Sequence, residues 1–146
     1  MPEEKPFYIW EGIYDSFHSA SLNCVGPGFR GEIYRKRTKM AYETCLAALN
    51  ADEPIPEFHK QRSTFLPAIV AMILGTKERV RVLDFGGGLG IGYMTLQESI
   101  CEDIRRVDYG IVEVPEVCDL GREISNTDYY TSIYLAGDCD LLHAAS

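Results

Sequence analysis

The fold of this 146-residue chain is decided by one stretch, Val80-Arg81-Val82-Leu83-Asp84-Phe85-Gly86-Gly87-Gly88-Leu89-Gly90. It begins as a β-branched apolar run, which predicts a strand over 80–85. Four glycines follow within five positions, and the chain then continues with helical spacing of apolar residues from Ile91 to about Glu102. Glycines let a strand turn abruptly into a helix and let the backbone approach a ligand, because no Cβ atom stands in the way. The stretch therefore predicts a strand–turn–helix unit with a ligand at the turn.

Helices and strands alternate on both sides of this unit. We predict helices over 31–50, 63–74, 91–102 and 115–124, a linker over 51–57, and strands over 80–85, 109–114, 129–133 and 140–145. Such alternation is typical of an α/β fold, here a Rossmann-like, doubly wound and mostly parallel sheet. Ligands of these sheets bind beyond the carboxyl ends of the strands. The 63–74 helix, capped by Ser63, is apolar nearly all round and the 140–145 strand is nearly continuously apolar, so we expect both to be buried.

The chain is expected to divide near residue 60. Residues 1–60 would form an N-terminal aromatic and helical extension. In it, Trp10, Tyr14 and Phe17 would form a small satellite core that packs on the sheet. Residues 61–146 would form a partial Rossmann-like domain that holds the ligand.

Composition disfavours several classes of function. The chain carries 14 basic and 22 acidic residues, a net charge of −8, whereas a general nucleic-acid binder needs a basic surface. Its five cysteines are widely spaced and form neither a CxxC motif nor a Cys/His cluster, so neither a disulfide framework nor a metal site is indicated. The longest apolar stretch, Phe65–Leu74, is far shorter than the ~20 residues of a membrane span. We therefore expect a cytoplasmic protein that binds small molecules, without nucleic acid, membrane or metal.

Two cofactor classes use a glycine-rich strand-to-helix turn. Dinucleotide enzymes prefer G-x-G-x-x-G, with the pyrophosphate on the helix N-terminus. Here Gly86-x-Gly88 has Ile91 in the third glycine position, and the acid-led pattern D-x-G-x-G-x-G, which begins at Asp84, matches better. Glu113 lies 23 residues after Gly90, at the end of the next predicted strand. An acid in that position can accept both hydroxyl groups of a ribose.

These residues carry a resemblance to a known superfamily. Val82–Gly90 resembles the first motif of the class I S-adenosylmethionine-dependent methyltransferases, and Val112-Glu113 resembles their second. More narrowly, Trp10-Glu11-Gly12-Ile13-Tyr14 with Ser16-Phe17, and Val112-Glu113-Val114-Pro115, are similar to a family of methyltransferase-like proteins that often accompany surface-polysaccharide biosynthesis. The resemblance covers about residues 10–146.

The resemblance implies roles for eight residues in binding S-adenosylmethionine. Gly86, Gly88 and Gly90, with Gly87 in the same loop, would line the methionine moiety. Asp84 would reach its ammonium group and Glu113 would bind the ribose. Ser132 and Ile133, after the third strand, would flank the adenine. The implied reaction transfers the methyl group to an oxygen or nitrogen of a small acceptor, such as a sugar or a polysaccharide precursor.

The resemblance also implies a strand order. Class I methyltransferases have seven strands in the order 3-2-1-4-5-7-6, and this chain ends at Ser146, with the fourth. We therefore expect the partial order 3-2-1-4, with strand four as a bare edge through which the chain forms a homo-oligomer.

Three functions stay open at this point. They are a methyltransferase, a non-catalytic truncated remnant or nucleoside-binding module, and a fragment of a nicotinamide-dependent oxidoreductase. No catalytic residue is assigned. The sequence shows no partner for His143, so we expect it to be a core residue and not a base.

Overall fold

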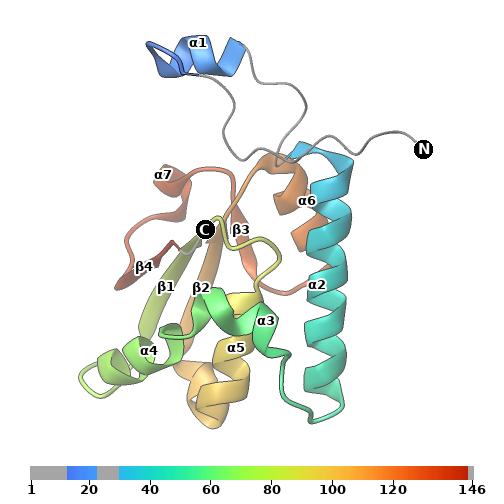
Figure 1. The fold of residues 1–146 in the computed structure, drawn as a ribbon. Helices are drawn as coiled ribbons and strands as arrows, with labels where there is room; N and C mark the ends of the chain where they lie inside the picture. Colours follow the sequence, from blue (N-terminus) through green and yellow to red (C-terminus); the bar gives the residue numbers. More distant parts are fainter. Residues whose placement is uncertain (1–12, 23–29, 145–146) are drawn as a thin grey trace.

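The computed structural model describes residues 13–22 and 30–144 and has an α/β fold (Figure 1). Its four strands are all parallel and lie in the order β3-β2-β1-β4. The helices and strands are α1 (Phe17–Leu22), α2 (Glu32–Asn50), α3 (Glu57–Lys60), η2 (Gln61–Ser63), α4 (Leu66–Leu74), β1 (Val80–Phe85), α5 (Ile91–Ile100), η3 (Cys101–Arg106), β2 (Val107–Val112), α6 (Pro115–Ile124), β3 (Asp128–Tyr130), α7 (Ile133–Ala136) and β4 (Leu141–His143). The expected Rossmann-like order 3-2-1-4 is confirmed.

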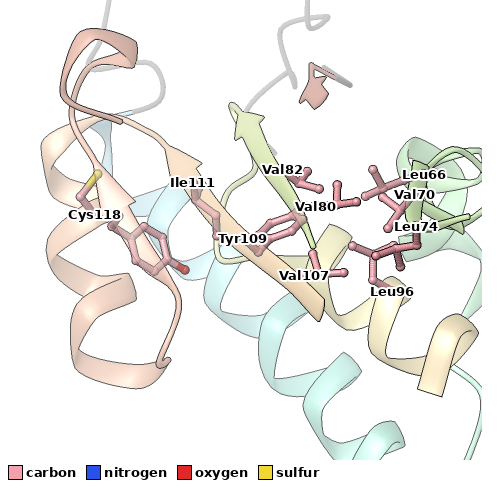
Figure 2. Packing of buried hydrophobic residues seen from close by; sticks show 11 residues of the cluster. Leu66, Val70, Leu74, Val80, Val82, Leu96, Val107, Tyr109, Ile111 and Cys118 are labelled. Atoms are coloured by element: carbon pink, nitrogen blue, oxygen red, sulfur yellow. The ribbon is translucent and has the colours of Figure 1, made fainter. Parts of the chain in front are cut away.

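One face of the sheet carries the main hydrophobic core. Side chains alternate between the two faces of a strand, so Val80 and Val82 of β1 share this face with Tyr109 and Ile111 of β2. They pack against buried apolar residues of α4, α5 and α6, as Figure 2 shows for the eleven residues of the cluster. The four side chains are at most 5 % exposed. This packing fixes the strands relative to the helices that follow them.

The other face is covered more thinly. In the part of the chain that the structure describes, its cluster consists of Leu83, Val112 and Ala136, with Tyr130 packed against them. Ala136 belongs to the four-residue α7, which is the helix that contacts this face. The Arg81 guanidinium also lies here, and its Nη2 donates to the Ala136 carbonyl at 2.7 Å. Both faces thus carry helices, but to different extents.

Helix α2 forms an outer layer over α5, in Figure 1 the long helix beside α5 and α6. Its Tyr42 and Cys45 pack with Leu89, Met94 and Val117 in a second hydrophobic cluster. Residues of the expected N-terminal extension therefore share a core with the sheet domain. The division near residue 60 stays a prediction.

Two expectations about burial are wrong. Helix α4 is buried along Val70 and Leu74, but Met72 is 75 % exposed, because β1 and α5 pack against one side of the helix. Strand β4 is limited to Leu141–His143, and its Leu142 is 49 % exposed on the face where α7 contacts β2 and β3. β4 does lie at the edge of the sheet, and association of two copies through it stays a prediction.

Three expected boundaries are also wrong. The second strand runs over Val107–Val112 and not over 109–114. Ser63 is the last residue of the 3-10 turn η2 and does not cap α4. Helix α4 begins at Leu66, and Phe65 is its N-cap residue. The third strand ends at Tyr130, and Ile133 begins α7. The Ser132 hydroxyl accepts a hydrogen bond from the Tyr134 N–H, which starts a helix where the β-branched composition predicted strand.

Some expectations fall on residues outside the described ranges. Trp10 lies outside them, as does the side chain of Phe17, so the satellite core with Tyr14 is not described. Within residues 13–22 and 30–144, every helix is too short or too polar to span a lipid bilayer.

Candidate functional site

The glycine turn lies between the carboxyl end of β1 and the start of α5. Gly86, Gly88 and Gly90 have φ angles of +74°, +59° and +89°. L residues with a side chain rarely adopt this left-handed region, so the turn requires glycine at these positions. The Gly86 N–H donates to the Val112 carbonyl at 2.9 Å, which ties the turn to the end of β2. The predicted strand–turn–helix unit is confirmed.

Two further glycines make room for a buried carboxylate. A Cβ atom at Gly87 would collide with the carboxylate of Asp84. A Cβ atom at Gly92, in the first turn of α5, would lie 2.5 Å from the Tyr109 hydroxyl and 3.0 Å from Asp84 Oδ2. Both contacts are closer than real Cβ atoms tolerate. These glycines therefore allow the turn and α5 to approach Asp84 closely.

Asp84 is 3 % exposed and has a partner on each carboxylate oxygen. The Tyr109 hydroxyl donates to Oδ2 at 2.6 Å, and His143 Nδ1 lies 2.8 Å from Oδ1. All three side chains lie on the face of the sheet that carries the main hydrophobic core, because Asp84 is in register with His143 and Tyr109 is in register with Val82. The structure thus pairs His143 with Asp84, whereas the sequence suggested a histidine without a partner.

The surroundings of His143 favour its charged form. Nδ1 faces the Asp84 carboxylate, and Nε2 lies 3.2 Å from the backbone carbonyl of Arg62. Both partners are acceptors, and an imidazole donates from both nitrogens when it is protonated. The hydrogen bond to Asp84 raises the pKa of His143, against an opposing effect of burial. Burial, and then Asp84, raises the pKa of Tyr109, which keeps its hydroxyl a donor.

Glu113, directly after β2, reaches back to the glycine turn. Its Oε1 accepts from the Gly88 N–H at 3.1 Å and from the Tyr34 hydroxyl at 3.4 Å. Its Oε2 accepts from the Val114 N–H at 2.9 Å. The side chain therefore joins the ends of β1 and β2 to helix α2.

Tyr34 is a residue of this site that the sequence did not indicate. Burial raises the pKa of its hydroxyl, and the nearby Glu113 raises it further. The positive charge of Arg62 acts on this pKa in the opposite direction. Tyr34 lies 79 residues before Glu113, and no local motif marks such a pairing.

The structure brings together most of the residues expected to bind a cofactor. Asp84, the glycines of the turn and Glu113 all lie at the carboxyl ends of β1 and β2. Ser132 and Ile133 follow β3 at the same edge, where parallel strands end together. The hydrogen bonds of these two residues within the described chain join them to α7 and not to the turn.

A cavity of about 460 Å³ lies beside α5, from Leu89 and Gly90 at the end of the glycine turn to the amino ends of β2 and β3. Its lining includes Val107 and Asp128, the first residues of β2 and β3, and it carries both a cation, Arg79, and carboxylates. Ligands of parallel α/β sheets bind at the opposite, carboxyl end. We therefore place the candidate site at the carboxyl ends of β1 and β2, around Gly86, Gly88 and Glu113, and not in this cavity.

The described residues bring no three His, Cys, Asp or Glu side chains together as a metal site. Comparison of the chain with models of protein families, with curated proteins and with solved structures found no match in any of the three.

Proposed function

We propose that the chain binds S-adenosylmethionine at the glycine turn and transfers its methyl group to a small acceptor, such as a sugar. One observation carries the proposal: Glu113 lies at the end of β2 and contacts the Gly88 N–H of the turn after β1. A bound adenosyl ligand would then have an acid for its ribose beside a backbone that it can approach closely. This arrangement supports the resemblance to class I methyltransferases.

The residues present fit the expected cofactor. A Cβ atom added at Gly86 would meet nothing within 4 Å, so the turn is open on that side. The Glu113 carboxylate accepts hydrogen bonds, as the hydroxyl groups of a ribose require. The Asp84 oxygens already have partners in Tyr109 and His143, so its contact with an ammonium group stays a prediction.

S-adenosylmethionine, when bound, would supply an electrophilic methyl group on a sulfonium. The turn and Glu113 would hold its two ends, and the chain would contribute to the rate mainly by placing the acceptor in line with the methyl group and excluding water. A hydroxyl acceptor also has to lose a proton, and this needs a base.

The turn favours an adenosyl ligand over a dinucleotide. A pyrophosphate binds to free backbone N–H groups at the start of a helix. Here the Gly86 N–H donates to Val112 O and the Gly88 N–H donates to Glu113. The Gly90 N–H donates to Gly87 O at 3.0 Å. Three donors of the turn are thus engaged within the protein.

One observation favours a second candidate, a nucleoside-binding module without catalysis. The imidazole of His143 lies at the carboxyl end of β4, but both of its nitrogens face acceptors. A protonated ring held in this way does not offer a basic nitrogen to an acceptor hydroxyl. The module would keep the ligand site and lack the proton-accepting group.

Calorimetric titration with S-adenosylmethionine, S-adenosylhomocysteine and NAD tests the proposal. We expect both adenosyl ligands to bind, and Glu113→Ala to weaken them at least about tenfold, because each charge-assisted hydrogen bond contributes roughly 1.5–3 kcal/mol. Glu123→Ala, on the exposed side of α6, is the matched control and should bind as the wild type does. Binding of NAD alone would refute the proposal. Release of S-adenosylhomocysteine with a sugar acceptor separates the enzyme from the module.

A further inference from the structure

The Glu113 carboxylate is almost fully engaged in the free protein. A carboxylate has about four lone-pair sites for hydrogen bonds. Three are used, by the Gly88 N–H at 3.1 Å, the Val114 N–H at 2.9 Å and the Tyr34 hydroxyl at 3.4 Å. A ligand with two neighbouring hydroxyl groups needs two sites. One of the three present donors therefore has to leave when such a ligand binds.

Tyr34 is the donor that can leave. The other two donors are backbone groups, one in the glycine turn and one in the residue next to Glu113. The Tyr34 bond, at 3.4 Å, is longer than the 2.5–3.0 Å typical of O–H···O bonds. The Thr38 side chain, one turn further along α2, donates a hydrogen bond to the Tyr34 oxygen, which lowers the pKa of Tyr34. The Tyr34 oxygen keeps this partner when its O–H leaves Glu113.

The surroundings of Tyr34 place it at the ligand site. A Cβ atom at Gly88 would lie 3.2 Å from Thr38 Cγ2, so the first half of α2 lies over the glycine turn. The Tyr34 hydroxyl also lies 3.4 Å from Glu113 Oε1, which accepts from the Gly88 N–H of the same turn. Tyr34 therefore lies beside both Glu113 and the glycine turn.

We propose that Tyr34 is a specificity-determining residue, which holds Glu113 in the free protein and yields its place to a vicinal diol of the ligand. The inference rests on the function proposed above. A ligand with one hydroxyl uses the remaining site of Glu113 and leaves Tyr34 in place. A diol ligand has to break the Tyr34–Glu113 hydrogen bond, and the free energy of that bond is subtracted from its binding free energy.

Tyr34→Phe tests this competition, because it removes the hydroxyl and keeps the ring. We expect the variant to bind S-adenosylhomocysteine about two- to fivefold more tightly than the wild type, since the long hydrogen bond from Tyr34 to the Glu113 carboxylate no longer has to be broken. The 2′-deoxy analogue of the same ligand should bind equally to both proteins. Calorimetric titration of the two ligands against the two proteins gives all four affinities.

Tyr42→Phe is the matched control from the same helix. The Tyr42 hydroxyl donates to the Ile124 carbonyl at 3.0 Å, away from Glu113, so its removal should leave both affinities unchanged. An unchanged or weaker affinity of Tyr34→Phe for S-adenosylhomocysteine would overturn the inference. An equal gain for the diol and the 2′-deoxy ligand would overturn it as well.

Glu113→Ala separates failure of this inference from failure of the proposed function. If the wild type binds the adenosyl ligand and Glu113→Ala loses it while Tyr34→Phe changes nothing, the site is correct and the competition is wrong. If the wild type and Tyr34→Phe both fail to bind either ligand, the proposed function and this inference are both wrong.

Discussion

Removal of a single buried hydroxyl should measure how strongly the carboxylate of Asp84 is held. The Tyr109 hydroxyl donates to Asp84 Oδ2 at 2.6 Å, and the two residues are 5 % and 3 % exposed. A hydrogen bond to a charged acceptor contributes roughly 1.5–3 kcal/mol, and water screens it little at this depth. Tyr109→Phe keeps the ring in the main core and should therefore lower the free energy of unfolding by roughly 1.5–3 kcal/mol.

Urea denaturation followed by far-ultraviolet circular dichroism measures this loss. With a slope of roughly 2 kcal/mol per molar urea, the midpoint should fall by about 1 M. Tyr130→Phe is the control, because its hydroxyl accepts from Arg81 Nη2 at 3.3 Å in a half-buried position, and it should cost less than about 1 kcal/mol. If Tyr109→Phe is no more destabilising than Tyr130→Phe, the short bond to Asp84 does not hold the carboxylate as described.

Two further perturbations follow from the same packing. The raised pKa of His143 means that its stabilising effect is complete below about pH 6.5 and is lost as the pH rises through the folded-state value. The urea midpoint of the wild type should therefore fall as the pH rises above that value, and His143→Gln should not show this fall. If the urea midpoints of the two proteins depend on pH in the same way, His143 does not form a charged pair with Asp84. Gly121→Ala in α6 would place a Cβ atom 2.5 Å from Tyr129 Cε1, so overpacking of roughly 1–3 kcal/mol should exceed the ~1 kcal/mol gain in helix propensity. Thermal unfolding measures the result, and a raised melting temperature would show that the Tyr129 ring moves aside.

The parts of the fold that depend on local chemistry could be predicted. Strand β1 was evident from its β-branched run, and the turn was evident from four glycines within five positions. Helix α6 begins at Pro115 as expected, because proline suits the first position of a helix. The position of Glu113 next to the turn followed from strand order, since neighbouring parallel strands end at the same edge.

The parts that depend on tertiary contacts could not be predicted. The exposure of Met72 reflects which side of α4 faces the sheet, and apolar residues all round the helix gave no sign of it. Ile133 lies in a stretch whose composition is typical of a strand. It nevertheless begins a helix, because the Ser132 hydroxyl caps that helix by accepting from the Tyr134 N–H. The partners of His143 and Tyr34 are 59 and 79 residues away along the chain, so neither pair leaves a local pattern.

The strand order has a consequence for how the chain assembles. Tyr109 is 25 residues from Asp84, whereas His143 is 59 residues from it, and the entropy lost on closing a loop grows with its length. During synthesis, β1 and β2 can therefore pair while the second edge of β1 is still open. Strand β4 then pairs with this edge of β1, and its last residue, His143, is the second partner of Asp84. Docking of residues 141–143 thus completes both the sheet and the hydrogen bonding of the Asp84 carboxylate, so we expect it to be a late folding event.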